Sequence, residues 1–159
     1  MDAPALSVSS PHSHGLLRDV SGKRVYIDAS VFMAHFDQLD GPQGILCDLM
    51  AFLKGDGFIG MTSGTVLTEI LPPLLVSQDG EVVSKIASFI LNSCLFQLSH
   101  TFDEVDTMAE ELHAKKGLSV IDAVQVAKAL HYEADIYLTN KPDLDVPKPL
   151  KRLLLSDYL

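Results

Sequence analysis

The stretch FIGMTSGTVLTEILPPLLV, residues 58–76, contains one ionisable side chain, Glu69. Its hydropathy is high enough to suggest a membrane span. However, Gly60, Gly64 and Pro72-Pro73 interrupt the run, and a carboxylate in its second half would be costly in lipid. We therefore expect no membrane span here and look for a buried element of a globular fold.

A strand followed by a helix explains this stretch better. The run Phe58–Met61 is short and apolar, as buried strands are, and Thr62 or Ser63 is suited to cap the start of a helix. Beyond them, apolar residues recur at helical spacing: Val66, Leu67, Ile70, Leu71 and Leu74. The sequence thus predicts a strand–helix unit in which Glu69 shares a helix with a core-facing stripe.

Two other acids occupy similarly apolar surroundings. Asp28 follows Val25-Tyr26-Ile27, and Asp122 lies near the start of the apolar segment GLSVIDAVQVAKALHY. An unpaired carboxylate near a core costs several kcal/mol or loses its charge, so three such sites suggest one shared cation.

Composition limits the possible architectures and functions. The chain has 159 residues and 47% hydrophobic content, enough for one domain with a substantial core. Its formal net charge of −9 argues against broad, nonspecific affinity for nucleic acid. Residues 1–22 are rich in Ser, Pro, Ala and His and are predicted to form a flexible tail before a domain at 23–159. We expect no secretion signal in the first residues and a cytoplasmic protein with reduced Cys47 and Cys94.

From Lys23 onward, strand-like and helix-like segments alternate. The predicted strands are RVYID, the run near Phe58, CLFQLS, DIYL and Lys151–Leu155. The predicted helices are Ser30–Asp37, Pro42–Lys54, the Glu69 helix, Asp79–Asn92, Phe102–Lys116 and Leu118–Tyr132. Apolar strands separated by helices predict an α/β fold with a parallel central sheet covered on both faces. Asp28 then lies at the carboxyl edge of that sheet, where ligands gather.

Asp122 permits two interpretations. Val120, Ala123, Val124, Ala127 and Leu130 are expected to form the buried stripe of its helix, with Asp122 and Gln125 off that stripe. The spacing Ser119-x-x-Asp122 resembles a capping box, in which the acid serves only the helix start. The alternative is a site acid.

Four motifs together resemble a known family. YIDAS, LTEIL, GLSVIDAVQVAKAL and ADIYLTN occur in the order and approximate spacing of a PIN domain, of the small kind typified by the VapC toxin ribonucleases. The resemblance covers residues 23–159 and implies a three-layer α/β/α sandwich. By position, Asp28, Glu69 and Asp122 match the family's first three acids, and Ser30 matches its small polar position.

The resemblance implies a metal-dependent ribonuclease. Hard divalent ions such as Mg²⁺ or Mn²⁺ generate a nucleophilic water and stabilise charge on a scissile phosphate. Carboxylates about 5 Å apart repel by about 3 kcal/mol at an effective dielectric near 20, and a bound ion reverses that cost. Asp28 and Asp122 are then expected metal ligands, with Glu69 either a ligand or the residue that positions the attacking water.

One position departs from the family. Many members follow the fourth strand with Thr-Asn-Asp, whereas this chain has Thr139-Asn140-Lys141. Lys141 is expected to weaken divalent affinity, or to bind an RNA phosphate. Asp143 could supply the missing acid as a fourth metal ligand, or be an ordinary turn aspartate. We expect Ser30, Asn140 and Lys141 to support the site or contact substrate.

Two functional hypotheses follow. The first is an endoribonuclease that acts on RNA as the toxin of a type II toxin–antitoxin pair, forms a homodimer and is held by an antitoxin protein. The second is a PIN-like module that has lost turnover and binds RNA or a protein partner. The segment LPPLLV, residues 71–76, could line a groove for such a partner, although completion of the core is the simpler expectation. A receiver-like or phosphoryl-transfer domain is a third, weaker alternative, since no second acid adjoins Asp28 and no phosphate-binding Gly-rich loop is present.

Overall fold

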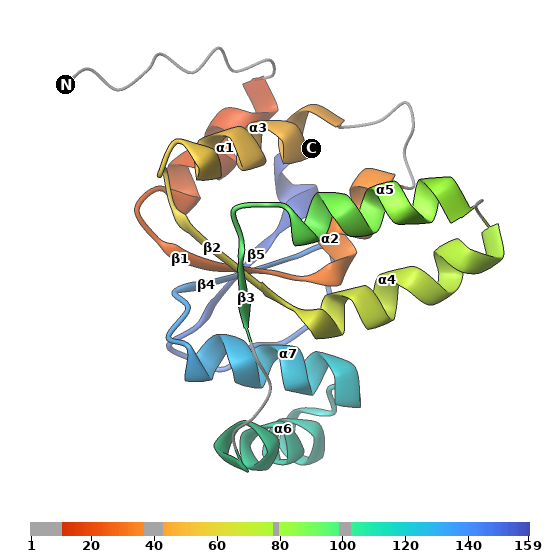
Figure 1. Cartoon of the computed structure of the whole chain (residues 1–159). Coiled ribbons are helices and arrows are strands. Elements are labelled where there is room, and N and C mark those ends of the chain that lie inside the picture. Colours follow the sequence, from red (N-terminus) through yellow and green to blue (C-terminus); the bar gives the residue numbers. More distant parts are fainter. Residues whose placement is uncertain (1–10, 37–42, 78–79, 99–102) are drawn as a thin grey trace.

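The computed structural model describes residues 11–36, 43–77, 80–98 and 103–159 of the chain (Figure 1). Its strands are β1 (Arg24–Ile27), β2 (Ile59–Ser63), β3 (Phe96–Leu98), β4 (Ile136–Thr139) and β5 (Lys151–Leu154). Its helices are α1 (Pro11–Val20), α2 (Ala29–Phe36), α3 (Gln43–Lys54), α4 (Gly64–Ser77), α5 (Gly80–Leu91), α6 (Asp103–Lys116) and α7 (Val120–His131), with a final 3₁₀ turn η1 (Leu155–Tyr158).

The strands form one parallel sheet in the order β3-β2-β1-β4-β5. All four residues of β4 and the last three of β1 are buried, as the continuous apolar runs predict for strands covered on both faces. The predicted α/β fold with a central parallel sheet is confirmed.

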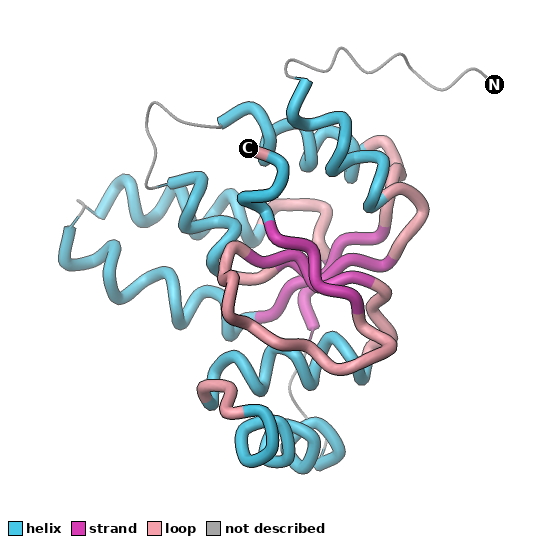
Figure 2. Tube along the Cα trace, turned by 180° about the vertical axis from the view of Figure 1, so that it is seen from behind, coloured by secondary structure: helices cyan, strands magenta, loops and turns pink. Residues whose placement is uncertain are grey.

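Helices lie on both sides of the sheet in both views (Figures 1 and 2). The first face packs Val25 and Ile27 into a cluster that includes buried residues of α1, α2, α3, α4 and α5. The second face packs Tyr26 and Tyr137 against α6 and α7, with the two rings stacked at a centroid distance of 5.2 Å. The arrangement is therefore the three-layer sandwich that the sequence resemblance implied.

The direction of strand order changes between β1 and β4. From β1 the chain adds β2 and β3 on one side, and then crosses over to place β4 and β5 on the other. The two strands pair in register, and the Asp28 amide continues the ladder by donating to the Leu138 carbonyl at 3.0 Å. Residues that follow β1 and β4 therefore meet at the switch point, the usual place for a ligand in such sheets.

The N-terminal segment differs from the predicted tail. Residues 11–20 form α1, which buries Leu16, Leu17 and Val20 in the first cluster. The Tyr158 hydroxyl also donates to the Asp19 carboxylate at 2.7 Å, which joins α1 to the chain's last turn. The prediction is thus wrong for residues 11–20, while residues 1–10 lie outside the described residues.

The stretch 58–76 forms the predicted strand and helix with shifted boundaries. Thr62 and Ser63 belong to β2 and do not precede the helix as caps; Thr62 Oγ1 instead donates to the Ile27 carbonyl at 3.2 Å. The helix α4 continues past Pro72 and Pro73, and Leu75 and Val76 near its end are 63% and 90% exposed. Completion of the core is therefore the wrong interpretation for these two residues. No helix in the described ranges is long and apolar enough to cross a membrane.

Candidate functional site

Asp28 anchors the site at the carboxyl end of β1. Its side chain is fully buried, and its Oδ2 accepts hydrogen bonds from Thr139 Oγ1 at 2.7 Å and Ser30 Oγ at 2.9 Å. Its Oδ1 is also buried and has no hydrogen-bond partner among the described residues. Asp28 is therefore held rigidly through one oxygen, while the other keeps unused acceptor capacity.

The chain after β4 is held at the same place, the corner where Asp28 follows β1 and β4 ends at Thr139. The Asn140 amide donates to Ser30 Oγ at 2.8 Å, and the Lys141 amide donates to Thr139 Oγ1 at 3.1 Å. On the far side of the turn, Arg152 of β5 donates to the carbonyls of Pro142 and Leu144. These bonds fix the backbone from which the Lys141 side chain leaves.

Glu69 reaches the same edge from α4. Its side chain is 16% exposed, and its Oε2 accepts a hydrogen bond from Gln125 Nε2 at 2.7 Å. Burial raises the pKa of Glu69, although the Lys141 ammonium and the bond from Gln125 act in the opposite direction. Keeping Glu69 ionised therefore works against its desolvation.

Asp122 lies in the first turn of α7. Both sequence interpretations of it, as part of the helix start and as a site acid, apply in part. Its amide donates to Ser119 Oγ at 3.1 Å, so Ser119 caps the helix as predicted. Its carboxylate is 15% exposed and contacts the Lys141 ammonium at 2.6 Å. Asp122 is thus a site acid as well as part of the helix start.

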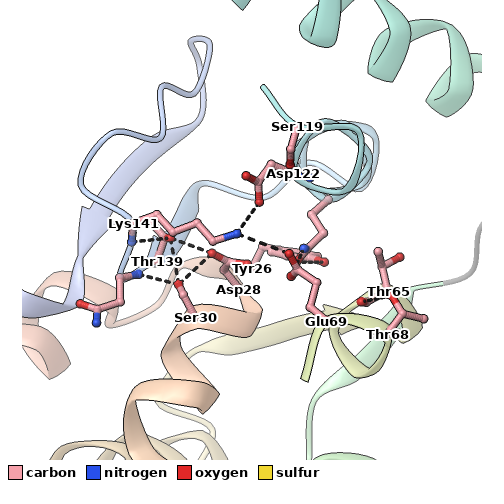
Figure 3. A network of polar contacts seen from close by, with 12 residues as sticks. Tyr26, Asp28, Ser30, Thr65, Thr68, Glu69, Ser119, Asp122, Thr139 and Lys141 are labelled. Carbon is pink, nitrogen blue, oxygen red and sulfur yellow. Dashed lines mark hydrogen bonds and ion pairs between the residues drawn. The ribbon is translucent and has the colours of Figure 1, made fainter. Parts of the chain in front are cut away.

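Lys141 connects these acids, as Figure 3 shows. Its Nζ lies 2.6 Å from Asp122 Oδ1 and 3.4 Å from Glu69 Oε1. Burial alone would lower the pKa of Lys141, but the hydrogen bond to Asp122 and the negative charges of Asp28, Asp122 and Glu69 outweigh it and raise that pKa. The ammonium is therefore a stable positive charge inside the acidic site.

A relay of hydrogen bonds connects Glu69 through Gln125 and Tyr26 to Ser63. Gln125 is fully buried; its Oε1 accepts from the Tyr26 hydroxyl at 3.2 Å, and that hydroxyl lies 2.9 Å from Ser63 Oγ. Burial raises the pKa of Tyr26, so its hydroxyl stays protonated. The expectation that Gln125 lies off the buried side of its helix is wrong, because the amide is needed to satisfy two buried partners. Its position three residues after Asp122, on the same helical face, was the available sequence signal.

Asp143 lies in the turn after β4. Its side chain is exposed, and no group of three metal-binding side chains in the described part of the chain includes it. Its role as a replacement acid stays a prediction.

As arranged, these residues do not fit a resident divalent metal ion. The donor types are suitable, since carboxylates are the ligands that Mg²⁺ and Mn²⁺ prefer, and the unpartnered Asp28 Oδ1 could serve as one. However, Lys141 takes an oxygen from both Glu69 and Asp122. Across the described ranges, moreover, no three His, Cys, Asp or Glu side chains are grouped closely enough to hold one ion.

Sequence comparison identifies no relatives. Neither models of protein families nor curated protein sequences match this chain.

Solved structures do match. VapBC-1 from nontypeable Haemophilus influenzae aligns with a TM-score of 0.61 at 12% identity, over 83% of this chain and 98% of that one. VapC20 from Mycobacterium tuberculosis, described as a toxin that cleaves the sarcin-ricin loop, aligns with a TM-score of 0.57 at 17% identity. The alignment covers 75% of this chain and 91% of VapC20. VapBC2 from Rickettsia felis, bound to a promoter DNA fragment, aligns with a TM-score of 0.56 at 17% identity. The alignment covers 81% of this chain and 98% of that one. At these identities the likeness concerns the fold, and this chain has the PIN-like fold of the VapC toxins.

Proposed function

We propose that this chain is an endoribonuclease that hydrolyses RNA phosphodiester bonds at its acidic edge, as the toxin of a type II toxin–antitoxin pair in the cytoplasm. The observation that carries this proposal is the position of Asp28 at the switch point of a PIN-like sheet, beside the Lys141 ammonium that contacts both Glu69 and Asp122. The likeness in fold to a toxin that cleaves RNA supports the same substrate class.

A divalent ion, Mg²⁺ or Mn²⁺, would be held by Asp28, Glu69 and Asp122, and it would supply an activated water and stabilise charge on the phosphate. A chain with a net charge of −9 has no large excess of Lys and Arg to attract RNA by itself. Because Lys141 takes an oxygen from both Asp122 and Glu69, the proposed activity requires it to release them first. We therefore expect slow turnover in the wild-type chain.

The contacts of Lys141 also favour the second candidate function, a PIN-like module that binds RNA or a protein without turnover. An ammonium 2.6 Å from Asp122 Oδ1 neutralises part of the charge that would attract a divalent ion. With this contact in place, the acidic edge has a structural role and the function lies in binding.

A ribonuclease assay on the full chain separates the two candidates. The wild-type chain and Asp28→Asn are incubated with a structured RNA and Mn²⁺, beside Lys115→Asn, which changes an exposed residue of α6. The ribonuclease proposal predicts cleavage by the wild type and the Lys115 variant, and none by Asp28→Asn. Equal RNA decay with wild type and Asp28→Asn would leave only the binding module.

We further propose that a small antitoxin protein binds this chain and that the chain forms a homodimer. Two matched structures are VapBC complexes, and Leu75 and Val76 offer exposed apolar surface on α4 for a protein partner. Co-expression with the product of an adjacent gene is expected to give a complex that co-purifies, and Leu75→Ser/Val76→Ser is expected to weaken it.

Sedimentation of the chain alone tests the homodimer, and a monomer across micromolar concentrations would exclude it.

A further inference from the structure

We propose that Lys141 is the resident counter-ion of the acidic site: its ammonium takes carboxylate oxygens of Glu69 and Asp122 that a divalent cation would need, so that replacing this one side chain frees them for a divalent cation. The inference concerns cation binding and does not depend on whether the chain cleaves RNA.

The backbone from which the Lys141 side chain leaves is held in place. The Lys141 amide donates to Thr139 Oγ1 at 3.1 Å, and the same hydroxyl donates to Asp28 Oδ2 at 2.7 Å. The preceding amide, of Asn140, donates to Ser30 Oγ at 2.8 Å. Because the turn is attached to the Asp28 corner, the lysine side chain starts from a defined point and crosses towards α7 and α4 (Figure 3).

The contacts of the ammonium differ from those of an ordinary surface ion pair. Exposed pairs contribute little because water screens them and two long side chains must be ordered. Here the Glu69 and Asp122 side chains are 16% and 15% exposed, and one ammonium contacts both. Low exposure strengthens the attraction between the ammonium and the two carboxylates.

The charges explain why one lysine can exclude a divalent ion. Asp28, Glu69 and Asp122 carry three negative charges, and Lys141 neutralises one of them while taking an oxygen from each of two acids. An incoming cation would have to displace a tethered ammonium that repels it. Without that ammonium, the remaining acids repel one another, and Asp28 Oδ1 already lacks a hydrogen-bond partner among the described residues.

The test is a titration with Mn²⁺ alone, followed by the electron paramagnetic resonance signal of free Mn²⁺ and by calorimetry. The variants are Lys141→Asp, Lys141→Met and the control Lys115→Asn, which removes an exposed lysine whose partner Glu111 lies 4.0 Å away. The double variant Asp28→Asn/Lys141→Asp removes a donor of the new site. Circular dichroism confirms that each variant is folded.

We expect the wild type and Lys115→Asn to show only weak, unsaturated Mn²⁺ binding. Lys141→Asp should bind one Mn²⁺ with a Kd lower by about tenfold or more, equivalent to about 1.4 kcal/mol, and Lys141→Met should fall between them. The double variant should lose this gain. A wild-type chain that binds one Mn²⁺ as tightly as Lys141→Asp would overturn the inference, and so would a folded Lys141→Asp without any gain. Failure of RNA cleavage in either protein would bear on the proposed function alone.

Discussion

The two halves of the acidic site are held by different forces. At the Asp28 corner, a fully buried carboxylate is fixed by two neutral hydroxyl groups from Ser30 and Thr139. Across the edge, Glu69 and Asp122 are less deeply buried and are joined through the single ammonium of Lys141. The first half is a scaffold that depends on short hydrogen bonds, whereas the second depends on charge and can change when that charge changes.

The largest loss of stability is expected from Thr139→Val, which keeps the side-chain shape but removes the hydroxyl group. The substitution deprives buried Asp28 of a donor and the Lys141 amide of its acceptor. Loss of a hydrogen bond to a charged group costs about 1.5–3 kcal/mol, which lowers the Tm of a chain of this size by about 3–12 °C. Thermal unfolding measures this loss of stability. The control is Thr68→Val, which changes an exposed residue of α4 and should have little effect on the Tm. Equal Tm values for the two variants would contradict a scaffold role for the corner.

Lys141→Met should cost less, about 1–2 kcal/mol. It leaves Glu69 and Asp122 without their cation, but the Lys141 side chain is 35% exposed and its contribution is partly screened. The distinguishing result is salt dependence: 1 M NaCl should shrink this loss and leave the Thr139→Val loss unchanged. If Lys141→Met lost the same amount of stability at low salt and in 1 M NaCl, packing and not charge would join this half of the site.

Tyr26→Phe tests the relay that connects the sheet with the second half. The change removes a hydroxyl that donates to Gln125 and lies beside Ser63, and a neutral hydrogen bond contributes about 1 kcal/mol. Urea unfolding should show this loss with an unchanged m-value. Because Tyr137 stacks on Tyr26 without a hydroxyl partner among the described residues, Tyr137→Phe is the matched control and should cost less.

The smallest effect concerns Glu69 and pH. Burial raises its folded pKa above the ordinary value of 4.5, so its ionised form opposes folding. This penalty is absent below pH 4.5 and develops as the pH rises through the folded pKa. Glu69→Gln should therefore have a higher Tm than the wild type at pH 7 and no advantage near pH 4. A lower Tm at pH 7 would mean that the contact with Lys141 outweighs the desolvation of Glu69.

The acids of the site could be predicted from the sequence better than the contacts that join them. Asp28 directly follows an apolar strand, and Glu69 is the only ionisable residue in its stretch, so local pattern was enough to mark both. Parallel order followed from apolar strands separated by helices. These features depend on near neighbours in the chain.

The partners of Lys141 and Gln125 could not be predicted in the same way. Lys141 is 19 residues from Asp122 and 72 from Glu69 in sequence, so its contacts depend on how the loop after β4 faces two helices. The polarity of Gln125 predicts a position off the buried stripe, although its amide satisfies Glu69 and Tyr26. For α1, the Ser and His residues of the segment concealed the apolar spacing of Leu16, Leu17 and Val20.

A crystal structure of the wild-type chain grown with MnCl₂, with anomalous data recorded near the Mn absorption edge, tests the central claim most directly. We predict Lys141 Nζ in contact with Asp122 and Glu69, and no anomalous peak between the three acids. A manganese ion bound by Asp28, Glu69 and Asp122, with the Lys141 side chain turned away, would contradict the account.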